Sequence, residues 1–124
     1  MTQQKVAIIE DDIAIVQMYR MKFQNEGYDV ETAGDGEAGL ELIKSVKPDI
    51  VLLDLMMPKM TGDKMLEQLR KQAWGKDVRV IILTNMGESE APKSVRENGV
   101  KQFIVKSNMT PRDVADIVKA ELAQ

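Results

Sequence analysis

Short apolar runs alternate along this chain with stretches whose apolar residues recur at helical spacing. The apolar runs predict five strands, at 5–9, 29–33, 50–53, 79–83 and 102–105. The 3.6-residue period predicts helices at 13–26, 37–47, 61–72, 86–98 and 110–122. Strands that alternate with helices pair in parallel through right-handed crossovers, with helices on both faces of the sheet. The pattern therefore predicts an α/β fold, a doubly wound (βα)5 sheet of five parallel strands.

The predicted strands differ in how deeply they should be buried. Residues 50–53 are four unbroken aliphatic side chains, which is typical of a central strand covered on both faces. Residues 29–33 alternate polar and apolar side chains, as a half-exposed edge strand does. We therefore expect the flavodoxin-like strand order 2-1-3-4-5, with 29–33 at one edge.

Two of the predicted helices differ in the strength of their signals. The last helix has Thr110 at the N-cap and Asp113 at the capping-box position, so its start is well defined. The segment 86–98 is polar and contains Pro92, so it supports at most a short helix ended by Gly99.

The length and composition of the chain exclude several classes of function. A chain of 124 residues is one domain, with an expected core over about 5–122 and no output domain within 1–124. It has no Cys and no His, which excludes disulfides, thiolate or imidazole metal ligands and a Ser-His-Asp triad. The net charge is −3 without a basic cluster, so we expect no nucleic-acid binding by this domain. The polar start and the lack of a long apolar segment lead us to expect a cytoplasmic protein without a membrane segment.

Polar side chains follow four of the predicted strands. Glu10 and Asp11 follow the first, Asp54 the third, Thr84 the fourth and Lys106 the fifth. Parallel strands bring their carboxyl ends to one edge of the sheet, where ligands bind in open α/β folds. Several carboxylates held close without a cation repel one another by several kcal/mol. Mg²⁺, which favours oxygen ligands, is the natural counter-charge.

Each of these residues also has an ordinary structural explanation. A solvated acidic turn, a strand-end cap, a strand-end hydroxyl and a solubilising edge lysine would account for them one at a time. Asp12, beside the acidic pair, fits the N-cap of the first helix better than a metal ligand. Matched polar groups at four strand ends are not what a core needs, and together they favour a functional site.

The chain from Lys5 to about Leu122 resembles a receiver domain of the bacterial response-regulator family, and in particular a single-domain chemotaxis regulator. No single feature is specific, but the set is, in this order and on these elements. The matching features are Glu10-Asp11, the run 48–54, Met57-Pro58, Gly62, Thr84, Phe103 and Lys106.

The resemblance implies a phosphoacceptor and a metal site. Asp54 would accept the phosphoryl group. Asp11, Asp54 and the backbone carbonyl of Met56 would bind Mg²⁺ directly, and Glu10 would act through a coordinated water.

The resemblance also implies how the phosphate is read. Thr84 and Lys106 would contact the phosphoryl oxygens, and Phe103 would turn inward when Thr84 moves. This would remodel the face formed by the fourth helix, fifth strand and fifth helix for a downstream protein target or for self-dimerisation.

The chemistry is consistent with these roles. A carboxylate is already ionised and attacks phosphorus without a general base. Because the chain has no His, the phosphoryl group must come from elsewhere, and the family implies a histidine kinase or a phosphotransfer protein as donor. The domain would then be no enzyme in the usual sense, promoting only its own phosphorylation and slow autodephosphorylation.

Three positions depart from the family's pattern. Ser107 replaces the usual Pro after Lys106, which leaves the isomer of that peptide open. Asn85 is larger than the residue often found after the Thr, and Met56 is bulky and apolar. Both would hinder water at the acyl phosphate, so we predict slow self-dephosphorylation.

Other functions fit the sequence less well. A non-phosphorylated interaction module of the same fold would not need the acceptor, the Thr and the Lys together. An Asp-nucleophile phosphohydrolase usually carries a second Asp two residues on, where this chain has Met56. A flavin or nucleotide binder would need a Gly-rich phosphate loop after the first strand, where the residues are acidic.

Overall fold

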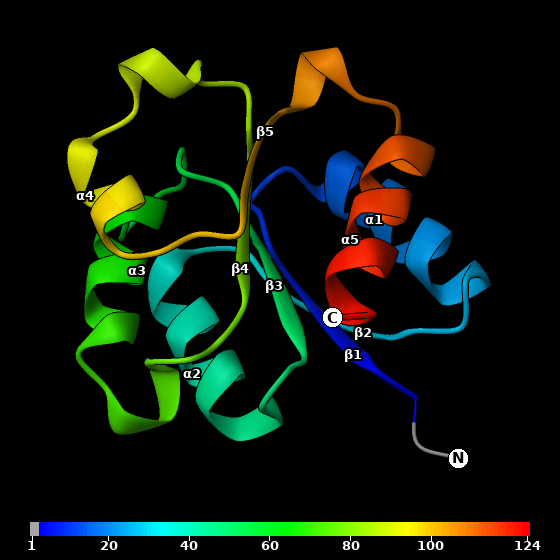
Figure 1. Ribbon diagram of the computed structural model, residues 1–124, viewed down its shortest axis with the longest axis horizontal. Helices are drawn as coiled ribbons and strands as arrows, with labels where there is room; N and C mark the ends of the chain where they lie inside the picture. The colour runs from blue at the N-terminus through cyan, green and yellow to red at the C-terminus, as the bar shows by residue number, and fades with distance from the viewer. Residues whose placement is uncertain (1–2) are drawn as a thin grey trace.

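Five parallel strands in the order β2-β1-β3-β4-β5 form the centre of the computed structural model, which describes residues 3–124 (Figure 1). The strands are β1 (Lys5–Ile9), β2 (Asp29–Ala33), β3 (Ile50–Leu53), β4 (Val80–Thr84) and β5 (Gln102–Val105). The helices are α1 (Ile13–Asn25), α2 (Gly36–Val46), α3 (Gly62–Arg70), α4 (Lys93–Glu97) and α5 (Pro111–Leu122). The predicted fold class and strand order are confirmed.

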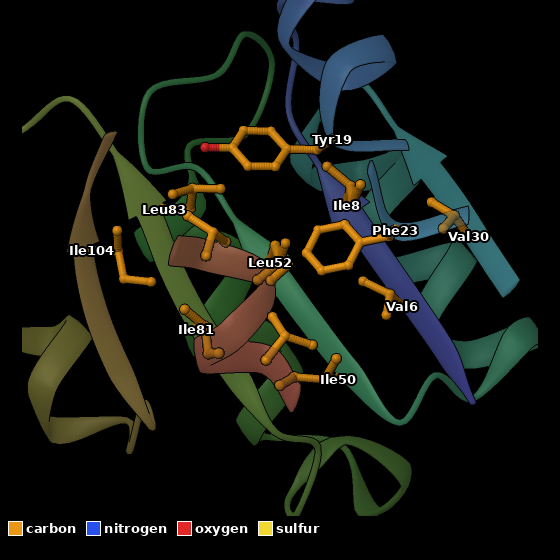
Figure 2. Close-up of a cluster of buried hydrophobic side chains, with 13 residues drawn as sticks. Val6, Ile8, Tyr19, Phe23, Val30, Ile50, Leu52, Ile81, Leu83 and Ile104 are labelled. Atoms are coloured by element: carbon orange, nitrogen blue, oxygen red, sulfur yellow. The ribbon is translucent and has the colours of Figure 1, made fainter. Parts of the chain in front are cut away.

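Helices cover both faces of the sheet (Figure 1). Tyr19 and Phe23 of α1 and Val114 and Val118 of α5 pack with side chains of the sheet in one buried cluster, part of which is shown in Figure 2. The opposite face packs against α2, α3 and α4. All four residues of β3 are buried, whereas only Val30 is buried in β2, as expected of a central and an edge strand.

Several element boundaries differ from the sequence prediction. β4 begins and ends one residue later than predicted, and α3 is shorter at both ends. α2 begins at Gly36, one residue earlier than predicted, because the Asp35 side chain accepts a hydrogen bond from Ala38 N at 2.8 Å and caps the helix. Three-residue 3₁₀ turns, too short to leave a periodic signal, occupy 73–75, 88–90 and 106–108.

Helix starts and one close packing contact agree with the sequence. The Asp12 side chain accepts a hydrogen bond from Ile15 N at 3.2 Å, so Asp12 is the N-cap of α1. Thr110 and Asp113 form the predicted capping box at α5. At Gly39 a Cβ would lie 2.8 Å from Ile9 Cγ2, so a glycine lets α2 approach the sheet.

α4 is the short helix expected of a polar segment that contains a proline. It spans only Lys93–Glu97, and Gly99 follows it in the left-handed region at φ 70°. Among residues 3–124 there is no helix that is both long and apolar enough to cross a membrane.

Candidate functional site at the carboxyl edge of the sheet

The carboxyl ends of β1, β3 and β5 bring an acidic cluster and a lysine together. Glu10 follows β1 and Asp54 follows β3, and their exposed fractions are only 5% and 6%. Backbone hydrogen bonds fix the two strand ends, because Asp54 N donates to Ile9 O at 3.0 Å. Lys106, directly after β5, reaches across to both carboxylates.

Three carboxylates converge at this edge. One oxygen atom from each of Glu10, Asp11 and Asp54 lies within 4.8 Å of the others. Asp11 is exposed, so the cluster opens to solvent on one side. All three donors are oxygens, the ligand type that hard divalent cations such as Mg²⁺ prefer. The donor set therefore fits such an ion.

One ammonium group serves the whole cluster. Lys106 Nζ forms an ion pair with Glu10 and lies 3.3 Å from Asp54 Oδ2. The Lys106 side chain is only 10% exposed, so solvent screens these charges weakly. Three carboxylates against one ammonium leave the cluster with excess negative charge when all are ionised. A divalent cation would balance that excess.

Burial and pairing shift the pKa values of Glu10 and Lys106. Burial is the largest influence on Glu10 and raises its pKa to about 7, against the opposing effect of the Lys106 hydrogen bond. Burial acts to lower the pKa of Lys106, but the hydrogen bond that its ammonium donates to Glu10 and the charge of Asp54 outweigh it, so that pKa is raised. The ammonium is thus held charged by its carboxylate partners.

The loop after β3 holds the Asp54 side chain. Asp54 Oδ1 accepts a hydrogen bond from Met56 N at 3.1 Å, which leaves Oδ2 toward Lys106. Gly62 N donates to Leu55 O at 3.0 Å, and a Cβ on Gly62 would lie 2.1 Å from the Asp54 carbonyl oxygen. Gly62 is one of the positions that carry the family resemblance, but the sequence gives no sign of this contact. The Met56 side chain is 56% exposed beside the site.

Thr84 and Phe103 are less directly connected to the carboxylates. Thr84 is fully buried at the end of β4, next to β3 in the sheet, and its hydroxyl accepts a hydrogen bond from Met86 N at 3.4 Å. Phe103 is partly buried and borders a cavity of about 510 Å³ with residues of α4. The peptide after Lys106 is trans, since residues 3–124 contain no cis bond.

The helical pattern of residues 13–26 gives no sign that one of its side chains lies near this site. Tyr19 of α1 is buried, and it borders a small cavity together with Glu10 and Asp54. Helical spacing predicts that a side chain faces the sheet, and it carries no information on where a phenol hydroxyl ends.

The chain belongs to the response regulator receiver domain family, whose model matches residues 6–119. Members of this family are signalling domains of two-component systems rather than classical enzymes. The family assignment agrees with the resemblance carried by the strand-end residues.

Curated relatives are longer regulators. A probable transcriptional regulator ycf27 from Guillardia theta is 34% identical over 121 residues, which is 98% of this chain and 46% of the relative. The alkaline phosphatase synthesis transcriptional regulatory protein PhoP from Bacillus subtilis is 34% identical over 119 residues, or 95% of this chain and 48% of that protein. The chain spans about half the length of the curated relatives it matches.

Solved structures share the fold over nearly the whole chain. A CheY-like receiver domain protein from Methanospirillum hungatei superposes with a TM-score of 0.89 at 27% identity, covering 98% of this chain and 95% of that one. A CheX–CheY–BeF3–Mg²⁺ complex from Borrelia burgdorferi contains a chain with a TM-score of 0.86 at 31% identity, covering 98% of this chain and 90% of that one.

Proposed function

We propose that this receiver domain accepts a phosphoryl group on Asp54 in a Mg²⁺-dependent reaction. One observation carries the proposal: the buried Asp54 carboxylate lies in a cluster of three carboxylates, with Lys106 Nζ 3.3 Å from its Oδ2. A core has no use for this charge, whereas phosphoryl transfer needs a nucleophile, a metal site and a cation together.

Asp11 and Asp54, with the backbone carbonyl of Met56, would hold the ion, and Glu10 would bind it through a water. When bound, Mg²⁺ neutralises charge on the transferring phosphoryl oxygens. Two observations support this assignment: the three side chains converge within 4.8 Å, and the Borrelia burgdorferi relative is named as a complex with BeF3 and Mg²⁺.

Asp54, Met56 and Lys106 each have a separate role in the phosphoryl transfer. An oxygen of the ionised Asp54 forms the bond to phosphorus, while the bond from phosphorus to the donor's leaving group breaks and that group keeps the electron pair. The backbone N–H of Met56 orients the Asp54 carboxylate through the hydrogen bond that it donates to Oδ1. Lys106, already 3.3 Å from Oδ2, is placed to contact the incoming phosphoryl oxygens.

Phosphorylation would act as the switch through Thr84 and Phe103. The added charge, roughly −1.5 to −2, attracts the Thr84 hydroxyl, and Phe103 turns into the vacated space. The short α4 and the cavity that Phe103 borders support a segment of low local stability. Chemical-shift mapping should show perturbation of Phe103 and of residues 86–108 on phosphorylation, and unchanged shifts there would contradict the switch.

The proposed partners follow from this chemistry. The chain has no His, so the phosphoryl group must come from another molecule, and membership of the receiver family implies a histidine kinase or a phosphotransfer protein as donor. The remodelled α4-β5-α5 face would bind a downstream protein target or a second copy of the domain. The curated relatives include DNA-binding regulators, but we assign no nucleic-acid contact to this acidic domain. We also infer a cytoplasmic location, the usual one for response regulators.

Phosphate-affinity electrophoresis after treatment with acetyl phosphate tests the proposal. The wild-type protein should show a retarded band with Mg²⁺ and lose it with a chelator, and Asp54→Ala should show none. Asp77→Ala, at an exposed position away from the cluster, is the matched control and should behave as wild type. A wild-type protein that never shifts would favour a non-phosphorylated interaction module.

Replacing Met56 should shorten the lifetime of the phosphorylated form. Its exposed apolar side chain lies two residues after the acceptor and limits the approach of water. We expect Met56→Asn to lose the phosphate several-fold faster, measured as decay of the retarded band after the donor is removed. Met21→Asn, at an exposed position on α1, is the control, and an unchanged lifetime in Met56→Asn would contradict the shielding role.

A further inference from the structure

The guanidinium group of Arg70 fastens the chain segments that lead into β4 and β5. Arg70 is the last residue of α3 and is partly buried. It donates hydrogen bonds of 2.7–3.3 Å to five backbone carbonyl oxygens, those of Gly75, Lys76, Val78, Asn98 and Gly99. Residues 75–78 precede β4, and residues 98–99 precede β5. One side chain therefore holds both segments against the end of α3.

These bonds fix the carboxyl end of α4. An arginine stays charged and presents its N–H donors in a rigid planar fork, so the carbonyl groups that it binds are held strongly and in set directions. The Asn98 side chain in turn donates from Nδ2 to Ser94 O at 2.7 Å, within α4. Residues 98–99 are thus a fixed end, which ties the last turn of α4 to α3.

The amino end of α4 has no comparable anchor within the described residues 3–124. In the segment 86–92, Glu90 N donates to Gly87 O and Ala91 N donates to Glu88 O, so these bonds stay inside the segment. Glu88 also pairs with Arg96 of α4, but both of these side chains are exposed. That pair links the segment to the helix without tying either to the rest of the fold. Residues 86–93 are thus a free end.

The free end begins beside the residue that the proposed switch moves first. The Thr84 hydroxyl accepts a hydrogen bond from Met86 N at 3.4 Å. This distance is longer than that of a typical hydrogen bond, so the contact is easily lost when Thr84 moves toward a phosphoryl group. A change at the site therefore enters the free end at Met86, far along the chain from the bonds of Arg70.

We propose that α4 pivots about the fixed end held by Arg70 when Asp54 is phosphorylated: residues 86–93 move, whereas residues 98–99 keep their place. The inference rests on the proposed function, because phosphorylation supplies the displacement. Residues from both ends of α4 line the cavity that Phe103 borders. The pivot changes the shape of this cavity while β5 keeps its start, and Arg70 is a positioning residue for the switch.

Two spin-label distances in the full chain test the pivot. Because the sequence has no Cys, introduced cysteines can be labelled specifically. One pair joins Lys44→Cys on α2 to Ser89→Cys at the free end, and the other joins Lys44→Cys to Lys101→Cys beside the fixed end. All three positions are exposed. After treatment with acetyl phosphate and Mg²⁺, the mean distance of the first pair should shift by about 2 Å or more, and that of the second should stay unchanged.

Intact mass spectrometry of the same labelled samples separates this inference from the proposed function. If no phosphoryl adduct forms, the phosphoacceptor role fails and the pivot fails with it. If the adduct forms, a first pair that does not shift, or a second pair that shifts as much as the first, overturns the pivot alone.

Arg70→Met tests the anchor, because it keeps an unbranched side chain and removes the donors. We expect the distance from residue 44 to residue 101 to shift on phosphorylation in this variant. Arg112→Met removes an exposed arginine of α5 and should leave that distance unchanged. Should Arg70→Met not fold, Arg70→Lys keeps the charge, loses the fork and should give a smaller shift of the same distance. A loss of stability with no response of this distance to phosphorylation would show a purely structural role for Arg70 and overturn the proposal.

Discussion

Replacing Lys106 by methionine should lower the free energy of unfolding without Mg²⁺ by about 2–4 kcal/mol. The substitution keeps the length of the side chain and removes the ammonium that Glu10 and Asp54 share. Two nearly buried carboxylates would then face each other without a counter-charge, and taking up a proton relieves only part of that cost. Chemical denaturation in the presence of a chelator measures the loss.

Mg²⁺ should restore much of the lost stability in Lys106→Met. A cation held at the proposed site by Asp11 and Asp54 would supply the charge that the ammonium supplied, so the variant should gain more stability from the ion than wild type does. Lys101→Met removes an exposed lysine and should change neither quantity. If Lys106→Met were as stable as wild type in the chelator, the shared ammonium would not balance the acidic cluster.

Gly62→Ala should destabilise the fold by about 3 kcal/mol and slow phosphorylation at the same time. The added Cβ would lie 2.1 Å from the Asp54 carbonyl oxygen and 2.8 Å from Leu55 Cα. Both contacts are with backbone, which cannot rotate away, so the loop that carries Asp54 must move. The hydrogen bond from Met56 N to Asp54 Oδ1 depends on that loop.

Gly34→Ala is the matched control for Gly62→Ala. A Cβ at Gly34 meets nothing within 4 Å, so we expect its free energy of unfolding to stay within about 0.5 kcal/mol of wild type. Denaturant titration and the rate of appearance of the retarded band measure the two effects. Equal behaviour of the two variants would contradict a steric role for Gly62.

The sheet edge could be predicted from sequence because parallel strands must place their carboxyl ends together. Residues 50–53 are all apolar because a central strand is covered on both faces, and residues 29–33 alternate because an edge strand is half exposed. In the structure Ile9 pairs with Leu53, and Thr84 pairs with Val105. This register brings the next residues of β1, β3 and β5, which are Glu10, Asp54 and Lys106, to the same edge of the sheet.

Other features depend on three-dimensional packing and leave no pattern in the chain. Which carboxylates Lys106 pairs with depends on the paths of three side chains across the sheet, and the contact at Gly62 depends on how the loop folds back on Asp54. The position of the Tyr19 hydroxyl depends on how α1 is rotated on the sheet. Helical spacing places the ring in the core but does not place its polar end.

Intact mass spectrometry of the protein treated with acetyl phosphate and Mg²⁺ tests the central claim most directly. A single phosphoryl adduct adds about 80 daltons, and borohydride trapping followed by peptide mapping should locate the modification at Asp54. Asp54→Ala should give no adduct under the same conditions. An unmodified wild-type protein, or an adduct on a residue other than Asp54, would contradict the account.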